Sequence, residues 1–281
     1  MKSSWMLVAG LLFAGMGMCV KLGSQYFSTM ELVFYRSLFG LFFVGAIVKM
    51  RGDSLATVNL RMHLSRGLTG LASLSLYFYS MTQLPVATAV TLNYTSSMFL
   101  TLITLLWYRE PIRLRLVFAI LLGFVGVMLL LRPTITGSQL PAGLLGLVSG
   151  FISALAYLNI KQLSAIGEPD ARVVFYFSFV STIISGVVLC FHEFHPINAQ
   201  GAGLLLGVGL FATLAQLAMT RAYRVGKTLI VSAFAYSTVV FASILGAVFL
   251  RELLSLSSWI GIVVIVVAGL LAMHESTGTS D

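Results

Sequence analysis

Three carboxamide side chains, those of Asn93, Asn159 and Gln216, lie within long apolar stretches of the sequence. A carboxamide can take part in up to four hydrogen bonds, and inside hydrocarbon it is costly unless it faces protein or a water-filled cavity. These side chains are therefore candidates to bind a polar solute. They could equally join neighbouring helices to each other, and the sequence leaves both interpretations open.

Aromatic and hydroxyl side chains accompany the carboxamides. Tyr79, Tyr157 and Tyr236 could hold a flat or cationic ligand if their rings point inward, or anchor the protein at the membrane surface if they do not. Ser97 follows Asn93 by four residues and shares its helix face, which predicts one polar stripe. A serine in a membrane helix more commonly assists helix packing, and that alternative also stands.

Two charged residues, Arg36 and Glu31, belong to one apolar stretch. Arg36 could attract a carboxylate or phosphate that enters a cavity, or it could reach toward the membrane surface or a carbonyl of a neighbouring helix. Glu31 begins the stretch and is the candidate for proton coupling, at a peripheral position. No Asp or Glu lies deeper in any stretch, so facilitated movement and exchange remain alternatives to proton-driven transport.

The sequence predicts no catalytic residue, no metal site and no cofactor. A membrane enzyme would need clustered acidic, histidine or nucleophilic side chains at one membrane face, and the sequence has no evident cluster of this kind. His192, Glu193 and His195 have a spacing that a metal could use, but we expect this stretch to be an outer loop.

The composition requires that membrane-spanning helices position these residues. Hydrophobic residues make up 58% of the 281 residues and charged residues only 9%, whereas soluble domains carry about 25% charged residues. A spanning helix needs about 20 mostly apolar residues. The predicted spans are 5–22, 30–48, 64–82, 87–107, 115–131, 141–161, 172–191, 201–220, 228–249 and 257–273.

Basic residues predict which side of the membrane each connection faces. With the N-terminus inside, most of the 17 lysines and arginines, Arg66 among them, fall on the cytoplasmic side, as the positive-inside rule requires. Both termini are then cytoplasmic. The net charge of +8 is scattered over these connections, which argues against a nucleic-acid partner.

The two halves of the sequence correspond to each other. Positions matched by a shift of 142 residues, or of 140 for the last pair, are Tyr94 with Tyr236, Arg109–Glu110 with Arg251–Glu252, and Gly10 with Gly150. An odd number of helices per repeat makes the second copy enter the membrane from the opposite side. We therefore predict an all-α integral membrane protein whose ten transmembrane helices form two inverted five-helix repeats, 1–135 and 136–274, followed by a short polar tail, 275–281. Inverted repeats favour alternating access around a site near the membrane midplane.

Several motifs resemble those of the drug/metabolite transporter superfamily of the EamA type. They are Arg66-Gly67, Tyr77-Phe78-Tyr79-Ser80, Leu84-Pro85-Val86-Ala87, Tyr94-Thr95-Ser96, Arg109-Glu110 and Gly126-Val127, echoed in the second half by 222–227 and Arg251-Glu252. The resemblance implies ten helices in inverted repeats and a central cavity lined by the first, third, fourth, sixth, eighth and ninth. Met98 stands where relatives often carry proline, which puts a kink of the fourth helix in doubt.

The predicted function is a secondary transporter that moves a small polar or amphiphilic metabolite, such as an amino acid or an S-adenosylmethionine-like solute. A polytopic membrane enzyme acting on a lipid phosphate and a non-transporting membrane sensor are the alternatives. The expected partners are the solute and membrane lipid, and the expected location is a bacterial inner membrane, as a monomer or homodimer. A cavity without carboxylates fits zwitterions or uncharged amphiphiles better than simple cations.

Overall fold

The computed structural model describes residues 4–52, 54–107, 114–131, 139–191, 194–226, 231, 234–252 and 254–277, and these form helices and connections without a strand. The helices are α1 (Trp5–Gly23), α2 (Thr29–Arg51), α3 (Leu60–Gln83), α4 (Val86–Tyr94), α5 (Ser96–Trp107), α6 (Leu114–Leu131), α7 (Leu140–Ala165), α8 (Asp170–Leu189), α9 (Ala199–Val225), α11 (Ser237–Phe249) and α12 (Leu256–Thr277).

The surface of the bundle suits a membrane. Among the described helices, α1, α2, α7, α8 and α9 are long and apolar enough to cross one. Large apolar side chains point outward from them and from their neighbours; Phe42 of α2, for example, is 70% exposed. Exposed apolar surface on this scale is stable against lipid and unfavourable in water.

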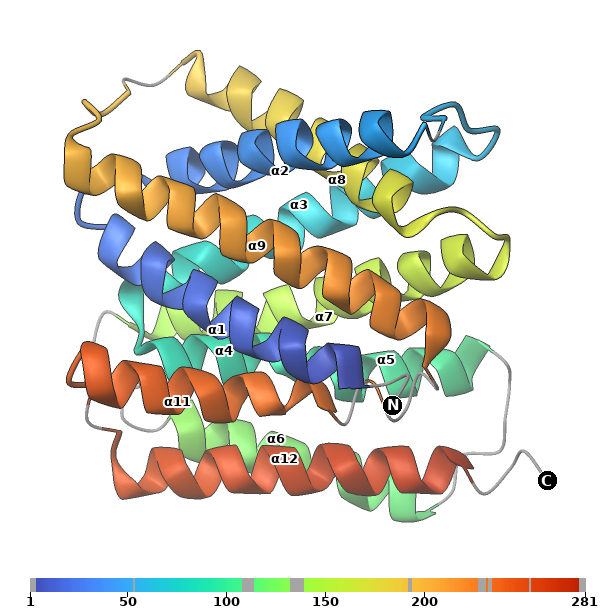
Figure 1. The fold of residues 1–281 in the computed structure, drawn as a ribbon. Coiled ribbons are helices and arrows are strands. Elements are labelled where there is room, and N and C mark those ends of the chain that lie inside the picture. Colours follow the sequence, from blue (N-terminus) through green and yellow to red (C-terminus); the bar gives the residue numbers. More distant parts are fainter. Residues whose placement is uncertain are drawn as a thin grey trace.

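The helices run along a common direction, and their packing partners are mostly distant in sequence (Figure 1). The pair α6 and α12 lies at one edge of the bundle, and α2 packs against α8 at the opposite edge. Between these edges α1 packs against α9, and α3 packs against α7. The beginning of α1 and the end of α12 lie at the same end of the bundle (Figure 1).

The fourth predicted span is two helices, because α4 ends at Tyr94 and α5 begins at Ser96. No proline is needed for this interruption. The hydroxyl of Thr95 donates a hydrogen bond to the carbonyl of Leu92 over 2.6 Å, which competes with regular helix bonding. The ninth predicted span has a similar interruption, where a turn at Tyr236 directly precedes α11.

A glycine of another helix lies against each interruption. A β-carbon added at Gly150 of α7 would lie 2.7 Å from the carbonyl oxygen of Leu92. A β-carbon added at Gly10 of α1 would lie 2.8 Å from Oγ of Ser237. A larger residue at Gly150 would meet backbone and force α7 away from the interruption, whereas at Gly10 the hydroxyl groups of Ser237 and Thr238 would also have to move.

A buried carboxylate joins two connections at the end of the bundle where α7 meets α8. Glu168 accepts hydrogen bonds from Thr57 Oγ1 at 2.6 Å, Asn59 Nδ2 at 3.1 Å and Arg172 Nη1 at 2.7 Å. Burial alone would raise the pKa of Glu168, but these hydrogen bonds outweigh it and lower the pKa to about 2. The α2–α3 connection is therefore held by a charged acceptor.

Candidate functional site

A cavity lined by apolar, aromatic and polar side chains lies at the centre of the bundle. Its volume is about 70 Å³, and its lining includes four of the predicted binding residues: Arg36, Asn93, Tyr157 and Gln216. They come from α2, α4, α7 and α9, so the fold brings together side chains up to 180 residues apart in the sequence. A water molecule needs roughly 10–15 Å³ by this measure, so the cavity holds a few water-sized molecules.

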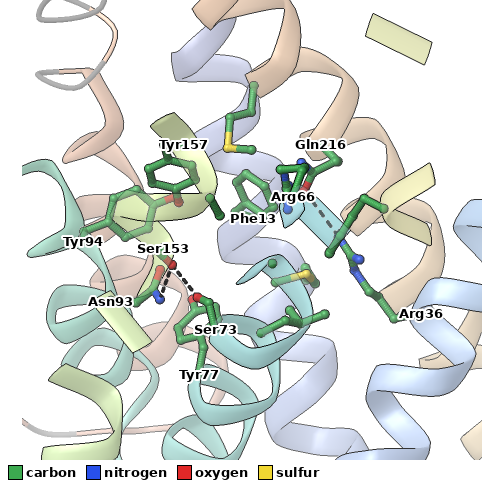
Figure 2. A pocket seen from close by; sticks show the side chains of 16 residues that line it. Phe13, Arg36, Arg66, Ser73, Tyr77, Asn93, Tyr94, Ser153, Tyr157 and Gln216 are labelled. Carbon is green, nitrogen blue, oxygen red and sulfur yellow. Dashed lines mark hydrogen bonds between the residues drawn. The ribbon is translucent and has the colours of Figure 1, made fainter. Parts of the chain in front are cut away.

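One side of the cavity carries Ser73, Asn93 and Ser153 (Figure 2). Together with Ser149 behind the lining, they form the serine–asparagine cluster. Asn93 Nδ2 donates hydrogen bonds to Ser149 Oγ at 3.0 Å and Ser153 Oγ at 3.1 Å. Ser73 Oγ donates to the carbonyl of Ser149 at 3.1 Å and also contacts the hydroxyl of Ser153. The cluster therefore joins α3, α4 and α7.

Tyrosines surround this cluster. Tyr77, Tyr94 and Tyr157 line the cavity, and Tyr157 stacks on Tyr223 of α9 with ring centroids 5.6 Å apart. The hydroxyl of Tyr94 accepts a hydrogen bond from Thr238 Oγ1 of α11 at 3.0 Å. Flat rings with hydroxyl groups allow this wall to hold both the apolar and the polar parts of an organic molecule.

The opposite side of the cavity carries the arginine pair, Arg36 of α2 and Arg66 of α3 (Figure 2). Both guanidinium groups lie over the ring of Phe177 of α8, at 4.8 Å and 4.3 Å from its centroid. Arg36 Nη2 also donates a long hydrogen bond of 3.4 Å to Gln216 Oε1. Both arginines are buried, with 4% and 3% of their surface exposed.

The sequence analysis counted Arg66 only among the basic residues of the cytoplasmic side and did not predict it as a binding residue. The predicted span began at 64, but α3 begins at Leu60, so Arg66 lies nearly two turns inside the helix. Space for its guanidinium comes from Gly70, where an added β-carbon would overlap Arg66 and lie 2.7 Å from the ring of Phe177. In the sequence, the glycines at positions 67 and 70 were the signal that the Arg66 side chain has space inside the bundle.

Four of the predicted binding residues lie outside the cavity lining. Ser97 and Tyr236 are buried beside the two helix interruptions. Asn159 donates hydrogen bonds to hydroxyl groups of α3 and so joins α7 to α3. Tyr79 is 39% exposed on the outer face of α3 and does not line the cavity.

Glu31 caps the beginning of α2 and does not line the cavity. Its carboxylate accepts a hydrogen bond from the backbone of Ser28, in a reciprocal capping box, and two more from the backbone and ring of His195. A coupling role for Glu31 stays a prediction. His192 and Glu193 lie outside the described residues, so the spacing noted there is not tested.

The turn between α3 and α4 is held from two directions. Lys21 Nζ of α1 donates a hydrogen bond to the carbonyl of Leu84 at 2.7 Å. Glu252, in the α11–α12 connection, accepts a hydrogen bond from the backbone of Val86 at 2.8 Å. Burial raises the pKa of Glu252, although the Val86 hydrogen bond and the charge of Lys21 oppose the shift. Glu252 therefore binds a distant helix N-terminus as well as ending its own span.

The cavity is lined by helices that differ in part from those that the family resemblance implied. Arg36 comes from α2, the second span, and Phe177 from α8, the seventh span. No described residue of α11, in the ninth span, lines the cavity. Buried charged and carboxamide side chains that meet in a cavity of an apolar helical bundle are an arrangement typical of membrane carriers.

Sequence comparison identifies the class. The sequence model of the EamA-like transporter family matches residues 2–132 and again residues 140–273. The chain belongs to the EamA-like transporter family, and it is a multi-pass transmembrane transporter. The predicted resemblance to the EamA type of the drug/metabolite transporter superfamily is thus confirmed.

Named relatives are also transporters. The pseudopaline exporter of Pseudomonas aeruginosa is 31% identical, over 97% of this chain and 95% of its own length. A riboflavin transporter of Vibrio cholerae is 30% identical, over 82% of this chain and 78% of its own length. A solved crystal structure has the same fold, with a TM-score of 0.72 at 18% identity over 97% of this chain and 98% of that chain.

Proposed function

We propose that this protein is a ten-helix secondary carrier that moves a small polar or amphiphilic organic metabolite by alternating access around the central cavity. The observation that carries the proposal is the cavity itself. Four predicted binding residues from four helices meet there in an otherwise apolar bundle. Intramembrane polar side chains that converge in this way mark a solute pathway.

The proposed inverted repeats, 1–135 and 136–274, are supported by reciprocal packing. In the proposed repeats, α1 corresponds to α7, α2 to α8 and α3 to α9. The contact of α1 with α9 then corresponds to that of α7 with α3, and both contacts are extensive. In the same way, the contact of α2 with α9 corresponds to that of α8 with α3. Gly10 and Gly150 lie against corresponding interruptions, and the family model matches the two halves separately. Such a bundle has two near-equivalent arrangements, one open at each end.

The size of the cavity supports a nearly closed state. Sites for drug-sized ligands usually measure about 300–1,000 Å³, whereas this cavity measures about 70 Å³. A metabolite of such size would enter only when the bundle opens at one end. The hydrogen bonds of Lys21 and Glu252 at the α3–α4 turn are then contacts that opening at that end would break.

The solute is a small organic metabolite, and the relatives give two examples of different kinds. One is named for pseudopaline and another for riboflavin at nearly the same identity, so neither name transfers by similarity alone. Amino acids and S-adenosylmethionine-like solutes remain candidates from the sequence. The alternatives of a lipid-phosphate enzyme and a membrane sensor are less favoured, because the family and its named members are transporters.

Counterflow in liposomes tests the proposal. Purified protein is reconstituted and screened with labelled amino acids, S-adenosylmethionine, riboflavin and organic acids, with and without an imposed pH gradient. We expect at least one solute to exchange faster than in protein-free liposomes. If no solute of a broad panel moves, the carrier proposal is wrong, and a pH-independent rate would argue against coupling through Glu31.

A further inference from the structure

Among the described residues, the arginine pair has no counter-ion. The nine acidic residues of the sequence are at positions 31, 53, 110, 168, 170, 193, 252, 275 and 281, none of them deep within a predicted span. In the part of the chain that the structure describes, neither Arg36 nor Arg66 forms an ion pair with a carboxylate. Two positive charges therefore share one buried wall of the cavity.

Hydrogen bonding of the two guanidinium groups is also incomplete. Nε of Arg36 and both Nε and Nη1 of Arg66 are buried and have no partner among the described residues. The ring of Phe177 offers its face to both groups, but a ring face accepts no strong hydrogen bond and carries no net charge. An intramembrane charge is expected to have a partner, and here the cavity is where that partner can bind.

We propose that the transported solute is an organic anion whose carboxylate or phosphate group binds to Arg36 and Arg66. The proposal rests on the proposed carrier function and names the class of its substrate. A guanidinium is planar and presents paired donors that match the oxygens of these two groups. The remainder of the solute would lie toward Tyr157 and the serine–asparagine cluster on the opposite wall (Figure 2).

This substrate class differs from the one expected from the sequence. A cavity without carboxylates was expected to favour zwitterions and uncharged amphiphiles, and only Arg36 was considered as an anion ligand. Two arginines on one ring favour a net negative charge, because a zwitterion would bring a cation into a cavity that already holds two. Gln216, which accepts from Arg36, would position that guanidinium.

Ligand-dependent thermal stability of the full-length protein in detergent tests the proposal. The probes are succinate, inorganic phosphate, the uncharged succinamide and the cation putrescine, at equal ionic strength. The variants are Arg36→Gln and Arg66→Gln, with Arg224→Gln as a control because Arg224 pairs with Asp170 outside the cavity. We expect succinate or phosphate to raise the melting temperature of the wild type and of the control. Both cavity variants should bind the active anion roughly tenfold to hundredfold more weakly.

The melting temperature without ligand separates a loss of ligand binding from a loss of fold stability. Without ligand, Arg36→Gln and Arg66→Gln should melt at a higher temperature than the wild type, because each removes one of two uncompensated buried charges. A response to succinate alone would assign a carboxylate, and a response to phosphate alone a phosphate. The proposal is wrong if no oxyanion stabilises the wild type, if succinamide or putrescine stabilises it as well, or if both variants keep the anion response.

Counterflow distinguishes this proposal from the carrier function on which it rests. Movement of only neutral or cationic solutes would support the carrier and overturn the anion site. Anion binding that depends on both arginines, together with no counterflow of any solute, would support the site and overturn the carrier.

Discussion

The two walls of the cavity differ in how well their polar groups are satisfied. In the serine–asparagine cluster, the side chains of Ser73, Asn93, Ser149 and Ser153 all have hydrogen-bond partners within the protein. In the arginine pair, three buried nitrogen atoms have none among the described residues. The side chains of both walls are buried, so burial alone does not distinguish a structural cluster from a binding site.

The difference indicates a division of roles. A satisfied buried network stabilises the packing of its helices and gains little from a ligand. An unsatisfied one costs stability in the free protein and regains it when a ligand supplies the missing partners. Substitutions should therefore affect mainly stability on the serine–asparagine wall and mainly transport on the arginine wall.

The largest expected effect follows from filling the space beside the arginine pair. In Gly70→Val the new side chain would displace Arg66 and Phe177, and we expect transport to fall by roughly tenfold to hundredfold as the charged hydrogen bonds to solute are lost. Initial rates of counterflow measure this. Gly203→Ala is the control, because no atom lies within 4 Å of a β-carbon added there. Equal rates for wild type and Gly70→Val would remove Arg66 from the site.

The next effect is on stability. Asn93→Ala leaves Ser149 and Ser153 without their shared donor and opens a small cavity, so we expect it to lower the free energy of unfolding by about 1–3 kcal/mol. Thermal or denaturant unfolding in detergent measures the loss. Transport should fall less, because α4 loses two hydrogen bonds to α7 but keeps its packing against Gly150. A variant as stable as wild type would show that the cluster is not structural.

Gln216→Ala should reduce transport more than it reduces stability, the reverse of Asn93→Ala. The hydrogen bond that Gln216 accepts from Arg36 is long, at 3.4 Å, so we expect a change in unfolding free energy of less than about 1 kcal/mol. Transport should still decrease several-fold, mainly through a higher KM, because Arg36 is less well positioned. Concentration dependence of counterflow separates KM from the maximal rate. If Gln216→Ala and Asn93→Ala lose stability equally, the two walls do not differ as proposed.

The smallest expected effect is the pH dependence of fold stability that comes from Glu168, which lies outside both walls of the cavity. The folded pKa of Glu168, about 2, is below its ordinary value of 4.5. A carboxylate with a lowered pKa stabilises the fold above pH 4.5, and that contribution is lost as the pH falls from 4.5 toward 2. Melting temperature as a function of pH should show this decline, and Glu168→Gln should reduce it. An unchanged acid response in Glu168→Gln would place the sensitive group elsewhere.

Part of the site was predictable from the sequence because hydrocarbon penalises certain groups strongly. Gln216, Asn93 and Arg36 carry amide or charged groups within apolar stretches, and such groups turn toward protein. Asn159 met the same criterion but joins two helices, since packing between α3 and α7 decides which way it faces. Tyr79 carries no such penalty at a membrane surface, and its type alone could not place it.

Other features depend on contacts that no local pattern contains. Arg66 was counted only with the cytoplasmic basic residues because it lies near the beginning of its predicted span, and hydropathy does not show which way a side chain in the first turns of a helix faces. The interruption at Thr95 involves a threonine that bonds back to the carbonyl of Leu92 and a glycine of α7 that lies against the same carbonyl. The spans themselves follow from composition, and their arrangement follows from contacts between the two halves.

The arginine pair has a consequence for the electrical work of transport. Guanidinium groups attached to α2 and α3 stay in the protein when access changes from one end to the other, so the net charge that crosses is that of the solute. An anion that leaves an inside-negative compartment gains about 2.3 kcal/mol per elementary charge for each 100 mV of membrane potential. In a carrier with this cavity, the membrane potential alone would drive the anionic solute outward. No carboxylate that carries protons would be needed.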